Sequence, residues 1–133
     1  MHAQAVTPIL NVSYIKQSFE WFEKLGWIKR WDWGEPPVFG SVASANFEIF
    51  LCVDSQGSRG KGNNKSTFGE EGGENADKGV WMTIYVADVD QIHQHCISEG
   101  LEVMYGPEDM PWGVREVHLR HPDGHVFRIT QTL

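Results

Sequence analysis

One strand–helix pattern occurs twice in this chain, and it limits the possible folds more than any other feature. Each copy starts with a short apolar run typical of a strand, which ends at Val12 in the first copy and at Val86 in the second. A segment with helical periodicity follows, and a glycine closes it 14 residues after the valine, at Gly26 and at Gly100. The second copy lies 74 residues after the first. This spacing predicts a duplicated module.

The two predicted helices have clear starts and clear apolar faces. Ser13 and Asp88 are candidate N-caps, because their side chains can accept hydrogen bonds from the first turn. Residues that share one helical face are expected to pack on a sheet; they are Ile15, Phe19 and Phe22 in the first helix and Val89, Ile92, His93 and Cys96 in the second.

Strand-like sequence follows each helix, at 39–42 and 47–53 in the first copy and at 101–105, 114–120 and 126–130 in the second. The last two candidates are joined by residues 121–124, where proline and glycine suit a type I turn. Each copy is therefore one strand, one helix and two or three further strands. We predict a single α+β domain over residues 1–133, with a helix on one face of a mostly antiparallel sheet in each module.

The modules are expected at residues 1–53 and 80–133, with an insertion at 54–79 between them. This insertion holds seven of the 14 glycines and no aliphatic side chain larger than alanine. Such a segment cannot fold by burial of its own side chains. It is interpreted either as a linker or as a functional loop, a lid or an edge of a dimer.

Composition excludes several classes of function. The net charge is −7, so binding to a phosphate backbone is unlikely, and neither nucleic acid nor a membrane is an expected partner. An acidic balance suits a cationic ligand, although it also simply favours solubility. No secretion signal or membrane span is visible, and Cys52 and Cys96 fit buried thiols in a reducing compartment, so a cytoplasmic protein is expected.

Alternation along the strands predicts a second, helix-free face on each sheet. This face carries Glu48 and Phe50 in the first module. In the second module it carries Trp81, Tyr85, Glu116, His118 and Arg128. Aromatic rings mixed with charged groups fit a cleft with an apolar wall and a few polar anchors. The alternative is an oligomer interface with internal ion pairs.

Residues 110–127 carry a family resemblance. They read Met-Pro-Trp-Gly-Val-Arg-Glu-Val-His-Leu-Arg-His-Pro-Asp-Gly-His-Val-Phe and are similar to the Pro-Trp-Gly, Arg-Glu, Asp-Pro-x-Gly-Asn stretch of bleomycin resistance proteins. The opening segment, Val6–Trp27, also resembles the start of those proteins. The chain thus resembles the vicinal oxygen chelate superfamily, also called the glyoxalase/bleomycin resistance/extradiol dioxygenase superfamily. The resemblance implies two βαβββ modules whose sheets curl around a cleft, with the helices on the outer face.

Enzymes of this superfamily hold a divalent metal at four positions, and the resemblance places these at Thr7, Glu48, Trp81 and Arg128. Only Glu48 is a good ligand among them. We therefore expect no metal, no cofactor and no catalytic residue. The alternative is a metal-dependent lyase, isomerase, transferase or dioxygenase acting on a small oxygenated substrate, with a residual metal site at Glu48, Glu116 or His118.

The binding branch of the family implies a homodimer that holds its ligand in clefts between subunits. Its aromatic walls match Phe39 and Trp112 here. We expect sequestration of a small aromatic molecule, cationic as bleomycin is. The predicted ligand-binding residues are Phe39, Glu48, Phe50, Trp81, Tyr85, Trp112, Glu116, His118 and Arg128.

The remaining histidines are expected to be ordinary surface residues. His93 and His95 are two positions apart on a helix, so they cannot share one metal ion. His121 and His125 bracket a turn and are predicted to face solvent. His118 alone lies on the predicted cleft face, where it is also a candidate general acid or base.

Overall fold

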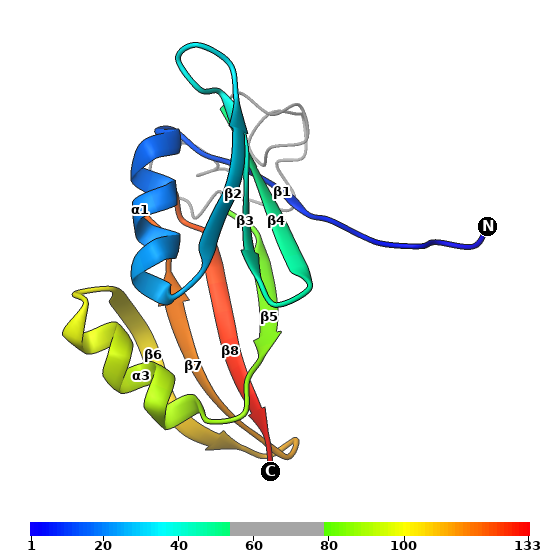
Figure 1. Ribbon diagram of the computed structural model, residues 1–133. Helices are drawn as coiled ribbons and strands as arrows, with labels where there is room; N and C mark the ends of the chain where they lie inside the picture. The colour runs from blue at the N-terminus through cyan, green and yellow to red at the C-terminus, as the bar shows by residue number, and fades with distance from the viewer. Residues whose placement is uncertain (54–78) are drawn as a thin grey trace, which may run out of the picture.

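The computed structural model describes residues 1–53 and 79–133, and it contains two four-stranded sheets with helices against one side of them (Figure 1). Module one comprises β1 (Ile9–Asn11), α1 (Ile15–Leu25), β2 (Ile28–Trp33), β3 (Phe39–Ser44) and β4 (Phe47–Cys52). Module two comprises β5 (Trp81–Tyr85), α3 (Val89–Ser98), β6 (Glu102–Met110), β7 (Val114–Arg120) and β8 (Val126–Thr132). The predicted α+β fold with two βαβββ modules is confirmed. Apart from Gly79, the predicted insertion at 54–79 lies outside the described residues.

The two sheets have the same strand order, β1-β4-β3-β2 and β5-β8-β7-β6. In each sheet the first strand of the module runs parallel to the last, and all other pairs are antiparallel. Among the described residues the two sheets do not close on each other, and each remains a separate four-stranded sheet (Figure 1).

Strand β2 was not among the predicted strands. All its residues are exposed, so its sequence lacks the alternation by which a half-buried strand is recognised. It is an edge strand, and its pairing with β3 shifts register between Lys29 and Trp31. Strand β6, also at an edge, runs five residues beyond the predicted 101–105 segment.

The helices form where the apolar faces predict them. Gly26 adopts the left-handed conformation that ends α1, as expected. Asp88 caps α3 by accepting a hydrogen bond from the amide of Gln91, which confirms that prediction. The prediction for Ser13 is wrong: Tyr14 is the N-cap of α1 and makes no side-chain cap bond. Ser13 instead donates from its amide and its hydroxyl to Asp123 of module two.

Helix α1 joins the two modules, because its aromatic side chains pack on module two. The Trp21 ring stacks on Phe127 of β8, with centroids 5.4 Å apart, and Phe22 meets the same ring edge-on at 5.7 Å. Phe22 and Phe127 are both fully buried. The hydrophobic core of the described residues is therefore continuous from one module to the other.

His121 and His125 are buried, so the prediction that they face solvent is wrong. His121 Nδ1 accepts from the amide of Asp123, which leaves its Nε2–H to donate to Ser18 Oγ of α1 at 2.8 Å. His125 Nδ1 accepts from the amide of Val80, and its Nε2–H donates to the Asn11 carbonyl at 2.8 Å. The β7–β8 turn thus carries two buried imidazole rings into the contact between the modules.

Both cysteines are free thiols, and burial raises the pKa of Cys96 to about 11. A thiol of this kind is a poor nucleophile at neutral pH. None of the described helices has the length and apolar character needed to cross a membrane.

Candidate functional site

The helix-free face of the second sheet places the predicted charged residues side by side. The strand registers align Thr83 of β5, Arg128 of β8, His118 of β7 and Tyr105 of β6 in one row across the sheet. Glu116 lies two residues from His118, on the same face of β7. Six side chains of this face form what we call the Arg128 patch: Trp81, Tyr85, Tyr105, Glu116, His118 and Arg128.

Glu116 is the centre of this patch, and its side chain is only 1% exposed. Its Oε2 accepts from Arg128 Nη2 at 2.7 Å, and its Oε1 accepts from His118 Nε2 at 3.1 Å. Burial by itself would raise the pKa of Glu116, but the hydrogen bonds from Arg128 and His118 outweigh it, and the pKa lies below its ordinary value. The carboxylate is therefore ionised at neutral pH, and both its oxygens are bonded within the chain.

Aromatic rings border the charged centre on both sides. Trp81 and Tyr85 are each 70% exposed and flank Thr83 on β5. On the other side the Tyr105 ring lies 5.1 Å from the His118 ring. Tyr105 was not among the predicted site residues, because it belongs to the part of β6 where the pairing with β7 is irregular.

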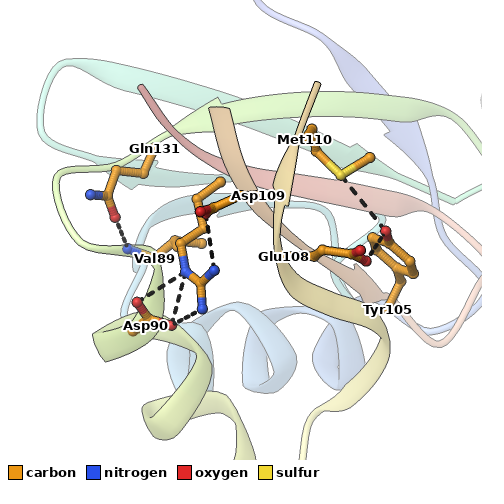
Figure 2. A network of polar contacts seen from close by, with 8 residues as sticks. Val89, Asp90, Tyr105, Glu108, Asp109, Met110 and Gln131 are labelled. Atoms are coloured by element: carbon orange, nitrogen blue, oxygen red, sulfur yellow. Dashed lines mark hydrogen bonds and ion pairs between the residues drawn. The ribbon is translucent and has the colours of Figure 1, made fainter. Parts of the chain in front are cut away.

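Figure 2 shows how the neighbouring side chains are held. The Tyr105 hydroxyl donates to Glu108 and lies 3.7 Å from the Met110 sulfur, all three on β6. The hydrogen bond to Glu108 raises the pKa of Tyr105 above its ordinary value. Separately, Arg115 binds both Asp90 of α3 and Asp109 of β6, which ties the start of α3 to the edge of the sheet.

The helix-free face of the first sheet carries a cluster of three rings, which we call the Trp31 cluster. Trp31 stacks on Phe39 with centroids 5.6 Å apart, and Phe50 meets both rings at 5.3 and 5.5 Å. Phe50 was predicted for this face from strand alternation, and Phe39 was predicted as a ligand-binding residue from the family resemblance. Trp31 was missed because β2 was missed.

Glu48 lies beside the Trp31 cluster and is also bonded within the chain. Its Oε1 is 3.2 Å from Arg30 Nη1, and its Oε2 accepts from Ser41 Oγ at 2.5 Å. Neither Arg30 nor Ser41 was predicted. The acidic anchors expected for a cationic ligand, Glu48 and Glu116, are thus both neutralised by arginines.

Among the described residues, the Trp112 ring makes no ring contact with the Trp31 cluster or with the Arg128 patch. It lies in the turn between β6 and β7 and is 61% exposed. Thr7 precedes β1 and belongs to no strand.

The four positions that hold a metal in related enzymes do not fit one here. Thr7, Trp81 and Arg128 offer no suitable donor. Within residues 1–53 and 79–133, no three His, Cys, Asp or Glu side chains are grouped closely enough to hold an ion. The three residues of the alternative metal site lie on different sheets, Glu48 on the first and Glu116 and His118 on the second.

A groove of about 380 Å³ lies between α1 and α3, away from both clusters. It is lined by Glu20, Glu23, Lys24, Gly26, His95 and Glu99. No Phe, Tyr, Trp or branched aliphatic side chain is among these residues, so the groove is a weaker candidate for an aromatic ligand than the two helix-free faces.

Comparisons with known proteins agree with this fold. Residues 2–129 match the sequence family described as Glyoxalase/Bleomycin resistance protein/Dioxygenase superfamily. A search of curated proteins gave no match.

Three solved structures illustrate the likeness. TioX from Micromonospora sp. ML1 superposes with a TM-score of 0.75 at 14% identity, over 98% of this chain and 100% of that one. A bleomycin resistance determinant encoded on the transposon Tn5 gives 0.70 at 15% identity, over 98% of both chains. A bleomycin-binding protein complexed with bleomycin gives 0.69 at 15% identity, over 98% of this chain and 100% of that one. At these identities the likeness shows the fold.

Proposed function

Because the chain belongs to the glyoxalase/bleomycin resistance protein/dioxygenase superfamily, we propose that it binds and sequesters a small aromatic molecule without changing it chemically. The observation that carries the proposal is the pairing of exposed aromatic rings with fixed ion pairs on both helix-free faces. Rings supply stacking area, and fixed polar groups orient a ligand.

The binding cleft in this proposal forms between two copies of the chain. Large apolar side chains lie exposed on the helix-free faces, among them Ile9, Trp33, Trp81 and Tyr85. Patches of this kind mark interaction surfaces. In a homodimer, the Trp31 cluster of one subunit faces the Arg128 patch of its partner, and the ligand lies between them. The two bleomycin-associated structures with this fold support the choice of a small-molecule ligand.

Each predicted ligand-binding residue has a role in this cleft. Phe39 and Phe50 form one aromatic wall, Trp81 and Tyr85 form the other, and Trp112 closes the rim. The charged residues Glu48, Glu116, His118 and Arg128 orient the polar part of the ligand. Free thiols in both described cysteines favour the cytoplasm as the place of action.

Titration calorimetry with bleomycin and with simpler planar aromatic compounds tests the proposal. Phe39→Ala and Trp112→Ala should each weaken binding by about 1–3 kcal/mol, the scale of lost stacking and burial. Tyr14→Ala, which removes an exposed ring at the start of α1 and outside the proposed cleft, should leave affinity unchanged. Absence of binding for every compound overturns sequestration.

The rival function is a metal-dependent lyase, isomerase, transferase or dioxygenase. The donor set at the four metal positions does not favour it. Elemental analysis of protein purified without chelators separates the two functions. Stoichiometric zinc, nickel, manganese or iron, lost on Glu48→Ala or His118→Ala, would replace the binding proposal with the enzymatic one.

A further inference from the structure

We propose that the ligand is a planar aromatic anion, whose carboxylate or equivalent oxyanion binds the guanidinium of Arg128. This inference rests on the proposed function, since it assigns the chemistry of the ligand in the same site. It replaces the cationic ligand that net charge and the two glutamates led us to expect.

The donors of Arg128 are only partly used within the described part of the chain. A guanidinium carries five N–H groups, and here Nη2 alone makes a hydrogen bond, to Glu116. The Arg128 side chain is 27% exposed on the helix-free face. A planar fork with one donor bonded to Glu116 and further N–H groups not hydrogen-bonded among the described residues is suited to an oxyanion, with which it forms short charge-assisted hydrogen bonds.

The acceptors of the patch, in contrast, are occupied. The Glu116 side chain is almost completely buried, and its two oxygens accept hydrogen bonds from Arg128 and His118. A cationic ligand at this point would meet a guanidinium and would have to displace it from a buried carboxylate. The net charge of −7 does not decide the matter, because fields from distant surface charges are screened beyond about 8 Å at physiological ionic strength.

The surroundings of Arg128 fit a flat ring. Its cross-strand neighbour on β5 is Thr83, a small side chain between the exposed rings of Trp81 and Tyr85. Residues two apart on a strand are about 7 Å apart, so Thr83 leaves a gap bordered by a ring on each side. A bicyclic ring over Thr83 contacts both neighbours, and an acid group on its edge reaches Arg128, since directly paired residues are about 5 Å apart.

Glu116 acts as a positioning residue in this arrangement. Its buried carboxylate fixes the guanidinium before a ligand arrives, so less side-chain freedom is lost on binding. His118 holds the other oxygen and keeps the carboxylate oriented.

Three probes with the same rings test the inference on the full chain: 2-naphthoate, 2-naphthylmethanol and 2-naphthylmethylammonium, titrated by calorimetry at neutral pH. We expect 2-naphthoate to bind about tenfold or more tighter than the alcohol, as hydrogen bonds to a charged group provide. The ammonium compound should bind most weakly.

Arg128→Gln should bring the affinity for 2-naphthoate down to that of the alcohol. Because this variant leaves Glu116 buried without its partner, the double variant Glu116→Gln/Arg128→Gln provides a second measurement on a neutral pair. Arg115→Gln is the matched control: it removes the same charge at the contact with Asp90 and Asp109, and it should keep the preference for the anion.

The outcomes separate this inference from the proposed function. If the alcohol or the ammonium compound binds as tightly as 2-naphthoate, and Phe39→Ala still weakens binding, the anionic ligand is wrong and sequestration stands. A preference for 2-naphthoate that survives in both Arg128 variants also overturns the role of Arg128. If none of the three probes binds while bleomycin or another planar aromatic compound does, the anionic ligand is wrong and sequestration stands. If no compound of either series binds, the proposed function fails as well.

Discussion

His121 shows how one buried side chain makes the whole fold sensitive to pH. Its ring packs against Trp21 and Phe22 and lies 5.3 Å from the His125 ring, and its Nε2–H donates to Ser18. Burial, reinforced by His125, lowers the pKa of His121 to about 4, and Asp123 opposes this only weakly. The folded protein therefore holds this imidazole neutral at pH values where the unfolded chain protonates it.

Stability should fall as the solution is acidified from about pH 6.5 to about pH 4. The pKa of His121 is lower in the folded state, so the unfolded state binds more protons in this window and gains stability. The loss should reach at most about 3 kcal/mol for this group. Urea denaturation at both ends of the window measures it.

His121→Asn should make stability depend less on pH within this window, because it removes the group whose pKa differs between the folded and unfolded states. The carboxylates, which titrate at lower pH, are the same in both proteins. Equal slopes for the wild type and His121→Asn would show that His121 does not carry the effect. Tyr14→Ala, at an exposed site, should keep the slope of the wild type.

Individual side chains were predictable where strand alternation decides their face. Glu48, Phe50, Glu116 and His118 all lie on the helix-free faces, as expected. Their partners were not predictable, because the bond between Glu116 and Arg128 depends on the register of β7 with β8, which alternation does not fix. His121 and His125 were misjudged for a related reason: a turn sequence shows that the chain reverses, and it does not show that another helix covers the turn.

At the scale of elements, α1 lies close on β3 because Gly40 has no side chain. A β-carbon at Gly40 would collide with the ring of Phe19 and would approach the Trp31 carbonyl at 3.0 Å. Phe19 is buried and is further fixed by Lys29, whose ammonium lies 4.6 Å from the ring centre. The spacing between helix and sheet is therefore set by this glycine.

Gly40→Ala should lower the free energy of unfolding by about 1–3 kcal/mol, the usual cost of overpacking. Chemical denaturation measures the change. The double variant Phe19→Leu/Gly40→Ala should recover part of the loss relative to the sum of the single changes, because the smaller side chain makes room for the methyl group. Strict additivity of the two changes would contradict the contact as the cause.

The start of α3 offers a second test at this scale. Asp88→Ala removes the bond to the amide of Gln91 and should cost about 0.5–2 kcal/mol. Asp88→Asn keeps an acceptor at the same place and is the matched control. Equal losses in both variants would assign the effect to charge rather than to capping.

Elements with a buried face were predictable, and the fully exposed edge strand β2 was not. The apolar stripe of α1 and the alternation of β4 and β7 identified them. Strand β2 is exposed along its whole length, so its sequence has no buried, alternating face. Its pairing with β3 therefore could not be predicted from its own residues.

At the scale of the molecule, two open sheet faces remain after the chain has folded. Trp33, Trp81 and Tyr85 are largely exposed on them. We expect the protein in solution to have twice the chain mass of 15.1 kDa by light scattering. Trp33→Glu should shift the mass toward that of one chain, because it places a charge in the contact.

Tyr14→Glu is the control for this shift, since Tyr14 is equally exposed at the start of α1. A single-chain mass for the wild type at all concentrations would contradict the dimer. It would also require the ligand to bind on one open sheet face.

The duplication itself was the most reliable information in the sequence. Equal spacing from strand to glycine predicted two alike modules, and their sheets do have the same order. How the modules meet could not be derived, because it depends on long-range contacts such as Ser13 with Asp123 and Trp21 with Phe127.

The identical strand orders have a consequence for synthesis on the ribosome. Every strand pair among the described residues lies within one module, so the strands of module one have their strand partners once Cys52 has emerged, before any of module two exists. Nascent chains can thus complete one sheet at a time, N-terminal half first. Trp21 of α1 packs on Phe127 of β8, so the core between the modules is completed only after module two has been made.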